Sequence, residues 1–447
     1  MGMQANQGRD GTGGVLIRGG RVIDPGSGTS LDADVLVRGG RVERIGPGLD
    51  AGDARVIDAA GCLVAPGLID PHVHLREPGG THKEDIASGT AAAVAGGFTT
   101  VCCMPNTRPT LDTPEVVRWV SDRAADAGAC RVFCVSAGTV GRKGERIADI
   151  AGCVAAGAVA ISDDGDAIAD PGVMRAVMRA CAEQGRVFMQ HCQDPAMTVG
   201  SVMHAGRVSR RLGLIGWPRE AEETIVARDI GICRETGGAY HIQHISSAGT
   251  VELIRRARAE GLAVSGEASP HHLLLTDDAV ERLGSAAKMN PPLREWADVV
   301  ALREGVADGT ITILATDHAP HAADEKRNPV ATAPFGIIGL ETALALYAEA
   351  LVHTGMIGWE RLIGLMTIGP ARLCGLDGRG LGSLVEGGIG DVTVIDPDRE
   401  WVIGPHDLRG KSVNTPFLGQ AVRGRAVATV VGGCVAFGPA REEVSVD

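Results

Sequence analysis

The chain has 447 residues, of which 44% are hydrophobic and 22% are charged, and its formal net charge is −12. This length predicts one large domain with a smaller one beside it. The acidic balance argues against nucleic acid or an anionic membrane as the main partner, although it leaves room for a local basic pocket. Eleven cysteines without a C-x-x-C pair, and no signal-peptide pattern, predict reduced thiols in a cytoplasmic protein.

Both ends of the chain are rich in short β-like runs. Residues 1–13 are rich in Gly and polar side chains, and we expect them to be a disordered extension. After them, apolar runs alternate with Gly-Gly and Pro-Gly turns, and the C-terminus repeats this pattern. The sequence therefore predicts one small composite β domain, a β-sandwich, built from residues 14–64 and 386–447.

The middle of the chain, residues 65–385, alternates strand and helix patterns. Helical patterns such as Pro114–Ala127 and Pro171–Gln184 begin with a proline after an Asp-Thr or an Asp, which suits the first helical turn. Eight apolar, β-leaning runs with helical crossovers favour an α/β fold, a (β/α)₈ TIM-type barrel. These runs span residues 63–70, 98–104, 130–135, 158–162, 187–191, 240–244, 262–266 and 311–317.

Most of these runs end in a polar residue that can bind metal or substrate. In barrel enzymes the C-terminal ends of the strands build the active site. His72 and His74 are two residues apart, so in a strand both imidazoles point to the same side and can reach one ion. His191, His244 and Asp317 end other runs, and imidazole with carboxylate ligands favours Zn²⁺, with Mn²⁺, Co²⁺ or Fe²⁺ as alternatives.

Four motifs carry a family resemblance. The segment Pro66-Gly-Leu-Ile-Asp-Pro-His-Val-His-Leu-Arg-Glu-Pro-Gly79 resembles the signature of the dihydroorotase branch of the amidohydrolase superfamily. Thr316-Asp-His-Ala-Pro-His321, followed by Glu325-Lys326, resembles the second signature of that branch. Cys103-Met-Pro-Asn-Thr107 and Pro270-His-His-Leu273 match it too. The resemblance runs from about residue 15 to 440, and it implies the same barrel and composite β domain.

The resemblance also implies a role for individual residues. One or two Zn²⁺ ions per chain would activate water for attack on a ring amide, with Asp317 as the catalytic proton carrier. The substrate would be a small anion, either dihydroorotate or N-carbamoyl-aspartate. The implied metal ligands are His72 and His74 for the buried ion, His191 and His244 for the second, Asp164 as the bridge, and Asp317 on the buried ion. The implied substrate contacts are Arg76, Asn106 and His321 for the carboxylate, and Asn290, Phe335 and Gly336 for the ring.

One position departs from many relatives, in which a carbamylated lysine bridges the two metals. The chain has only five lysines, at positions 83, 143, 288, 326 and 411, and none lies near residue 164. The matching position holds aspartate, as in one bacterial subset of the family. Asp163 is the alternative bridge, because a register error of one residue would exchange the two side chains.

Two other functions compete with dihydroorotase. Hydantoinase or dihydropyrimidinase and allantoinase share the barrel, but they need the bridging lysine and give no reason for Arg76. A non-catalytic partner of aspartate transcarbamoylase should have lost metal ligands, and every candidate ligand is present. A homodimer and an association with aspartate transcarbamoylase remain open as partners. Residues 318–337 form a long loop that we expect to fold over the substrate.

Overall fold

A computed structural model of the protein describes residues 13–439. Of the predicted N-terminal extension, only Gly13 lies within this range, and residues 440–447 of the predicted β domain lie outside it. Within residues 13–439, no helix combines the length and the apolar character needed to cross a bilayer.

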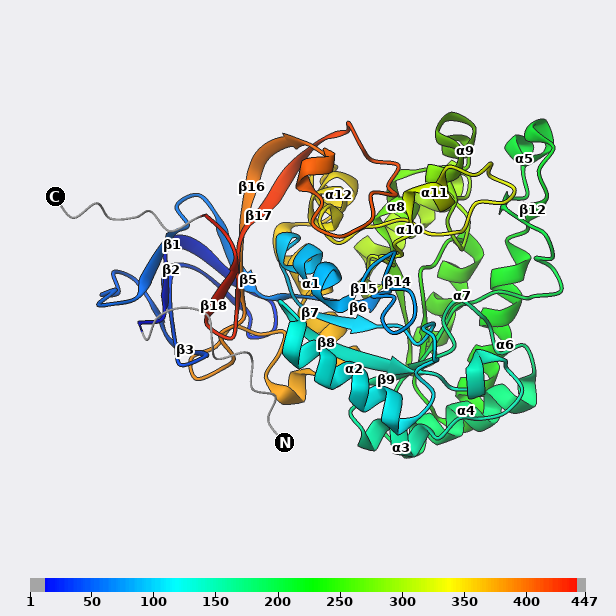
Figure 1. Ribbon diagram of the computed structural model, residues 1–447, viewed down its shortest axis with the longest axis horizontal. Coiled ribbons are helices and arrows are strands. Elements are labelled where there is room, and N and C mark those ends of the chain that lie inside the picture. Colours follow the sequence, from blue (N-terminus) through cyan, green and yellow to red (C-terminus); the bar gives the residue numbers. More distant parts are fainter. Residues whose placement is uncertain (1–12, 440–447) are drawn as a thin grey trace.

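The middle of the chain forms a barrel of eight parallel strands (Figure 1). A parallel bridge between Val73 and His318 brings the first strand beside the segment that follows the last one. The predicted fold class is therefore confirmed. In barrel order the strands are β6 (Leu68–Val73), β7 (Phe98–Cys103), β8 (Arg131–Ser136), β9 (Ala160–Ser162), β10 (Phe188–Gln190), β13 (Tyr240–Ile242), β14 (Val264–Ala268) and β15 (Ile313–Leu314).

Helices separate consecutive barrel strands, as the crossover pattern predicts. The Asp170 side chain accepts a hydrogen bond from the Val173 N–H, and Pro171 occupies the first turn, so the helix at 171 begins where expected. The crossover helices are α1 (Ile86–Ala95), α2 (Pro114–Ala127), α3 (Ile150–Ala155), α4 (Pro171–Glu183), α6 (Glu220–Thr236), α7 (Ala248–Ala259) and α10 (Trp296–Asp308).

Shorter elements extend the loops and close the barrel. The loop after β10 carries β11 (Met203–His204), α5 (Arg207–Leu212) and β12 (Gly216–Trp217). The remaining helices are η1 (Val140–Arg142), α8 (Pro270–Leu274), α9 (Asp278–Leu283), η2 (Gly284–Ala287), α11 (Ala323–Lys326), α12 (Ala343–Tyr347), η3 (Ala348–Val352), α13 (Trp359–Leu365), α14 (Ile368–Leu373), η4 (Asp377–Arg379) and η5 (Pro405–Asp407).

The first and the last strands of the described residues form a separate sheet domain. Figure 1 shows the blue N-terminal strands and the red C-terminal strands lying together beside the barrel. The sheet has a core of its own, to which Ile17, Val35 and Val430 contribute. Its strands are β1 (Val15–Asp24), β2 (Thr29–Arg38), β3 (Arg41–Gly46), β4 (Arg55–Asp58), β5 (Leu63–Pro66), β16 (Val392–Val402), β17 (Ala421–Val431) and β18 (Cys434–Phe437).

The first predicted barrel run, residues 63–70, is two strands rather than one. Leu63–Pro66 pairs with β16 and β1 of the sheet domain, whereas the barrel begins at Leu68. Gly67 separates the two strands, and a Cβ atom there would lie 2.0 Å from the Thr99 hydroxyl oxygen. The apolar pattern continues across the break because both strands are buried, so periodicity alone does not reveal the domain boundary.

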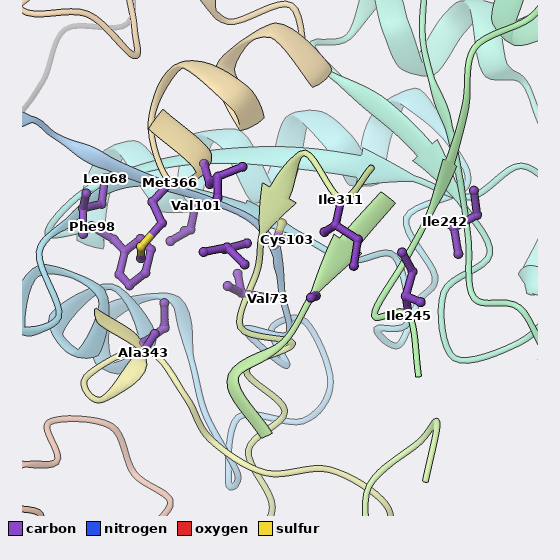
Figure 2. Close-up of a cluster of buried hydrophobic side chains, with 14 of the residues drawn as sticks. Leu68, Val73, Phe98, Val101, Cys103, Ile242, Ile245, Ile311, Ala343 and Met366 are labelled. Atoms are coloured by element: carbon purple, nitrogen blue, oxygen red, sulfur yellow. The ribbon is translucent and has the colours of Figure 1, made fainter. Parts of the chain in front are cut away.

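A large apolar cluster holds the barrel strands against their helices. Figure 2 shows side chains from β6 and β7, among them Leu68, Phe98 and Val101, packed near Met366 and Ala343. All five are buried. Because such packing is close to crystal density, the strand ends above it are held in fixed relative positions. This rigidity is what a site assembled from several strand ends requires.

Candidate metal centre and substrate pocket

The polar residues that follow the barrel strands meet in one pocket of about 210 Å³. All the predicted site residues except His72 line it. The lining residues are His74, Arg76, Asn106, Asp164, Gly165, His191, His244, Asn290, Asp317, Ala319, His321, Phe335 and Gly336. His72 is fully buried beside the pocket, and its ring lies 5.4 Å from that of His74, centroid to centroid.

Asp164 lies between two pairs of histidines. Its Oδ1 is 3.2 Å from His72 Nε2, and its Oδ2 is 3.4 Å from His74 Nε2. On the other side, Oδ1 is 3.7 Å from His191 Nδ1 and 3.8 Å from His244 Nε2. Two groups of buried side chains could each hold a metal ion, and Asp164 belongs to both. One group is His72, His74 and Asp164, and the other is Asp164, His191 and His244. Burial alone would raise the pKa of Asp164, but the charges of His72 and His74 hold it well below its usual value.

Asp163 faces the other way. Its Oδ1 accepts hydrogen bonds from the backbone N–H groups of Gly138, at 2.8 Å, and Thr139, at 3.0 Å. The Thr139 hydroxyl donates to its Oδ2. Burial raises the pKa of Asp163, and these hydrogen bonds oppose the rise. With every oxygen occupied by a local donor, Asp163 holds the loop after β8 and does not reach the histidines.

Asp317 lies on the His72–His74 side of the centre. Its Oδ1 is 3.0 Å from His74 Nε2 and 3.5 Å from His72 Nε2. Burial would raise the pKa of Asp317, but the close contact with His74 and the charges of the neighbouring histidines hold it below its usual value. The carboxylate is therefore ionised at neutral pH and able to accept a proton.

Three of the predicted site residues adopt left-handed backbone conformations. The φ angles are 59° for Arg76, 29° for His244 and 50° for Asp317. Such conformations cost roughly 1–2 kcal/mol for a residue with a Cβ atom. Strain of this kind persists where the surrounding structure overrides it, typically at functional sites. No pattern in the sequence indicated this strain.

Neighbouring amides fix the orientation of two histidine rings. The amide oxygen of Asn106 lies 2.8 Å from His74 Nδ1, which leaves Nε2 of that ring facing Asp164. The amide oxygen of Gln193 lies 3.0 Å from His191 Nε2, and it also accepts a hydrogen bond from Asn290. Gln193 was missed in the sequence, although it follows His191 by only two residues.

Glu267, in β14, was also missed. Its Oε1 lies 2.5 Å from His72 Nδ1, and the residue is fully buried. The available signal was a charged residue inside an apolar strand, since a buried carboxylate needs partners. Its partner His72 is 195 residues away in the sequence, so no local pattern reveals the contact.

Arg76 supplies a buried cation to the pocket. Its Nε donates to the Pro320 carbonyl oxygen at 3.1 Å, and one terminal nitrogen lies 3.4 Å from His321 Nε2. Burial lowers the pKa of Arg76 to about 10, against the opposing charges of Asp317 and Asp164, so it stays cationic at neutral pH. Burial also lowers the pKa of His321, to about 2, and the Arg76 charge adds to this, so that ring is neutral.

The loop after β15 is tied down over the pocket. Lys326 Nζ donates to three carbonyl oxygens, those of Lys288, Pro334 and Gly336. Asn414, from the C-terminal segment, donates to the Ala319 and Gly336 carbonyls and accepts from the His321 N–H. These contacts set the position of the loop that carries His321, Phe335 and Gly336.

Comparison with known proteins agrees with this geometry. Residues 61–250 match the family model described as dihydro-orotase-like. The chain is 46% identical over 424 residues to a dihydroorotase of Pelobacter propionicus, covering 95% of this chain and 99% of that one. It is 46% identical over 421 residues to a dihydroorotase of Pelotomaculum thermopropionicum, covering 94% and 98%. Among solved structures, an L-hydantoinase (dihydropyrimidinase) from Arthrobacter aurescens superposes with a TM-score of 0.84 at 26% identity, covering 96% and 97%. The chain belongs to the dihydroorotase family.

Proposed function

We propose that this chain interconverts dihydroorotate and N-carbamoyl-aspartate in pyrimidine synthesis. The observation that carries the proposal is Arg76. It is a buried guanidinium on the same pocket as the histidine cluster, and no carboxylate of residues 13–439 lies within 4.0 Å of it. A buried charge without a partner is costly, so the pocket is built for a substrate that brings a carboxylate.

The donor set fits a divalent metal such as zinc. His72 Nε2 is buried and has no hydrogen-bond partner in the described structure, although Asp164 and Asp317 oxygens surround it. His72, His74 and Asp317 would hold the buried ion, and Asp164 would join it to the His191–His244 side. When bound, zinc in such a set lowers the pKa of a coordinated water to about 7 and polarises a carbonyl group.

The protein's own groups move the proton. In the hydrolytic direction, Asp317 takes a proton from the attacking water and gives it to the ring nitrogen that leaves the carbonyl carbon. The ring amide C–N bond breaks as the new C–O bond forms, and the product carries one more carboxylate. Asp317 suits this role because it is ionised and lines the pocket.

The remaining pocket residues orient the substrate. Arg76 Nε already donates to the Pro320 carbonyl oxygen. The two terminal nitrogens of Arg76 can therefore donate a pair of hydrogen bonds to the substrate carboxylate. Asn106 has its amide oxygen beside His74 Nδ1, and its Nδ2 donates to Asp164 Oδ2 at 3.4 Å, so the second hydrogen of Nδ2 would serve a substrate oxygen. His321 contributes a neutral ring nitrogen beside Arg76. On the other side of the pocket, Asn290, Phe335 and Gly336 would contact the ring.

The competing hydrolases explain the pocket less well. Hydantoin and dihydrouracil carry no carboxylate, so they leave the Arg76 charge without a partner. The bridging position is an aspartate, whereas we expect a carbamylated lysine in those enzymes. A purely structural partner of aspartate transcarbamoylase has no need for a complete and buried donor set.

The substrate assignment is tested by turnover. Metal-replete protein should hydrolyse dihydroorotate, and form it from N-carbamoyl-aspartate at lower pH, with much lower activity towards hydantoin and dihydrouracil. Absorbance of the dihydropyrimidine ring follows both directions. Turnover of the uncharged rings without dihydroorotate would contradict the proposal, and inactivity towards all three would favour the structural role.

The loop of residues 318–337 gives a second test. We expect hydrogen exchange there to slow when dihydroorotate binds, because the loop carries His321 and the ring contacts. Asn414→Ala removes hydrogen bonds from the Ala319 and Gly336 carbonyls, each worth about 1 kcal/mol, and should raise KM roughly tenfold. Asn328→Ala, at an exposed position of the same loop, is the matched control and should leave KM unchanged. Identical exchange with and without ligand would argue against a lid.

The location is inferred from the cysteines, and the partners are inferred from the family resemblance. All eleven cysteines are free, and nine of them are buried, which suits a reducing compartment such as the cytoplasm. A homodimer and a complex with aspartate transcarbamoylase are the partner proposals. Sedimentation of the protein alone and with that enzyme distinguishes them.

A further inference from the structure

Glu267 is the centre of a hydrogen-bonded chain inside the barrel. Its Oε1 lies 2.5 Å from His72 Nδ1 and 3.2 Å from the backbone nitrogen of His244. Its Oε2 lies 3.0 Å from His241 Nε2. Burial would raise the pKa of Glu267, but the charges and hydrogen bonds of His72 and His241 hold it well below its usual value, so Glu267 is an ionised acceptor.

The chain continues beyond Glu267 towards the opposite end of the barrel. His241 Nδ1 lies 2.8 Å from the Ser265 hydroxyl oxygen. Ser265 is the second residue of β14, and it lines a cavity of about 520 Å³ that also touches the first residue of β15, Ile313. That cavity is at the N-terminal ends of these strands, whereas the metal pocket is at the C-terminal ends. Ser265, His241, Glu267 and His72 therefore form one relay along the barrel interior, here called the barrel relay.

The hydrogen-bond directions along the barrel relay are determined by its members. In the neutral tautomer of His241, Nε2–H donates to Glu267 and Nδ1 accepts from the Ser265 hydroxyl. At the other end, His72 Nδ1–H donates to Glu267. Nε2 of the same ring lies on the side of Asp164 and Asp317, so in the neutral ring its lone pair would be the one offered to a metal ion.

We propose that His241 and Ser265, acting through Glu267, are positioning residues that set the tautomer and orientation of His72 as a metal ligand. The inference rests on the metal centre proposed above. A carboxylate behind a ligating histidine fixes its tautomer and raises its basicity, and loss of such a partner typically weakens metal binding about 10–100-fold. The barrel relay extends this support by two further residues, to the far end of the strands.

Tyr347 provides a control that distinguishes positioning of His72 from general stabilisation of the barrel. Tyr347 is fully buried, and its single hydroxyl hydrogen is shared between the backbone oxygens of Ala268, at 2.9 Å, and Ala315, at 2.7 Å. It therefore links β14 to the residue after β15, and no hydrogen bond among residues 13–439 joins it to the barrel relay. Tyr347→Phe removes a buried hydrogen-bonding group from the same strands and serves as the matched control.

The experiment measures zinc affinity by competition with a chromophoric chelator, on full-length protein reconstituted with zinc. Glu267→Gln keeps the shape but removes the charge, and we expect affinity for the more tightly held ion to fall about 10–100-fold. His241→Phe should fall less, Ser265→Ala least, and Tyr347→Phe should match the wild type. In ¹⁵N-histidine-labelled protein, the His72 Nδ1–H resonance should shift in Glu267→Gln and in His241→Phe but not in Tyr347→Phe.

Each alternative outcome has a distinct meaning. Wild-type protein that binds no zinc would overturn the metal centre, and the positioning role with it. Tight binding by the wild type, with equal affinity in all four variants or equal loss in Tyr347→Phe, would overturn the positioning role alone. If Glu267→Gln does not fold, His241→Phe and Ser265→Ala decide the matter, because neither residue contacts the pocket.

Discussion

Asp164→Asn is expected to abolish most activity and to lower the amount of metal that the protein binds. Asp164 Oδ1 and Oδ2 face both halves of the centre, so its negative charge is shared between them. A neutral amide keeps the shape but cannot balance two dications. We expect the loss in kcat/KM to exceed about 100-fold, because even groups that only support a ligand are worth about 10–100-fold. Elemental analysis and turnover measure the two effects.

Asp163→Asn is the matched control, since it makes the same chemical change one residue away. An asparagine there can still accept the Gly138 and Thr139 N–H groups, and its amide can donate to the Thr139 hydroxyl oxygen. Metal content should stay near that of the wild type, with a stability loss of about 1–3 kcal/mol at most, as expected for one altered buried acceptor. A reversed result, with Asp163→Asn losing the metal, would exclude Asp164 as the bridge.

The same bridge predicts how stripped protein recovers. An aspartate carboxylate is permanent, whereas a carbamylated lysine must be rebuilt from carbon dioxide. Protein stripped of metal should therefore regain full activity with zinc alone in bicarbonate-free buffer. A requirement for bicarbonate would mean that a lysine, and not Asp164, completes the centre.

Arg76→Met should lower kcat/KM by roughly 10²- to 10⁴-fold while leaving metal content intact. The substrate carboxylate loses a buried, charge-assisted partner, and breaking such a pair by removing one member costs about 3–5 kcal/mol. Backbone strain does not contribute to the difference, because arginine and methionine face the same penalty at a φ of 59°. Initial rates with dihydroorotate measure the loss in kcat/KM, and elemental analysis measures the metal content.

Two further variants define what Arg76 does. Arg76→Lys keeps the charge but not the planar fork, so we expect an intermediate loss. Arg123→Met removes a nearby arginine that pairs with Glu77 outside the pocket, and its activity should remain normal. Near-normal turnover in Arg76→Met would remove Arg76 from the substrate site.

The sequence by itself determined the barrel, the sheet domain built from N-terminal and C-terminal strands, and the candidate ligands. Alternating apolar runs report which elements are buried, and polar residues at run ends report the edge where a barrel places its site. The i, i+2 spacing of His72 and His74 is likewise a local property of a strand. These features were predictable because each depends on neighbours within a few positions of the chain.

Only the tertiary structure decided how the site is supported. That Asp164 rather than Asp163 faces the histidines depends on the turn that follows β9, which lies after the last strand residue, Ser162. Glu267 reaches His72 across 195 positions of sequence. Asn414 comes from beyond the barrel to hold the loop of His321. Contacts of this kind form because the closed barrel brings distant strands together, and no local pattern in the chain encodes which side chains will then meet.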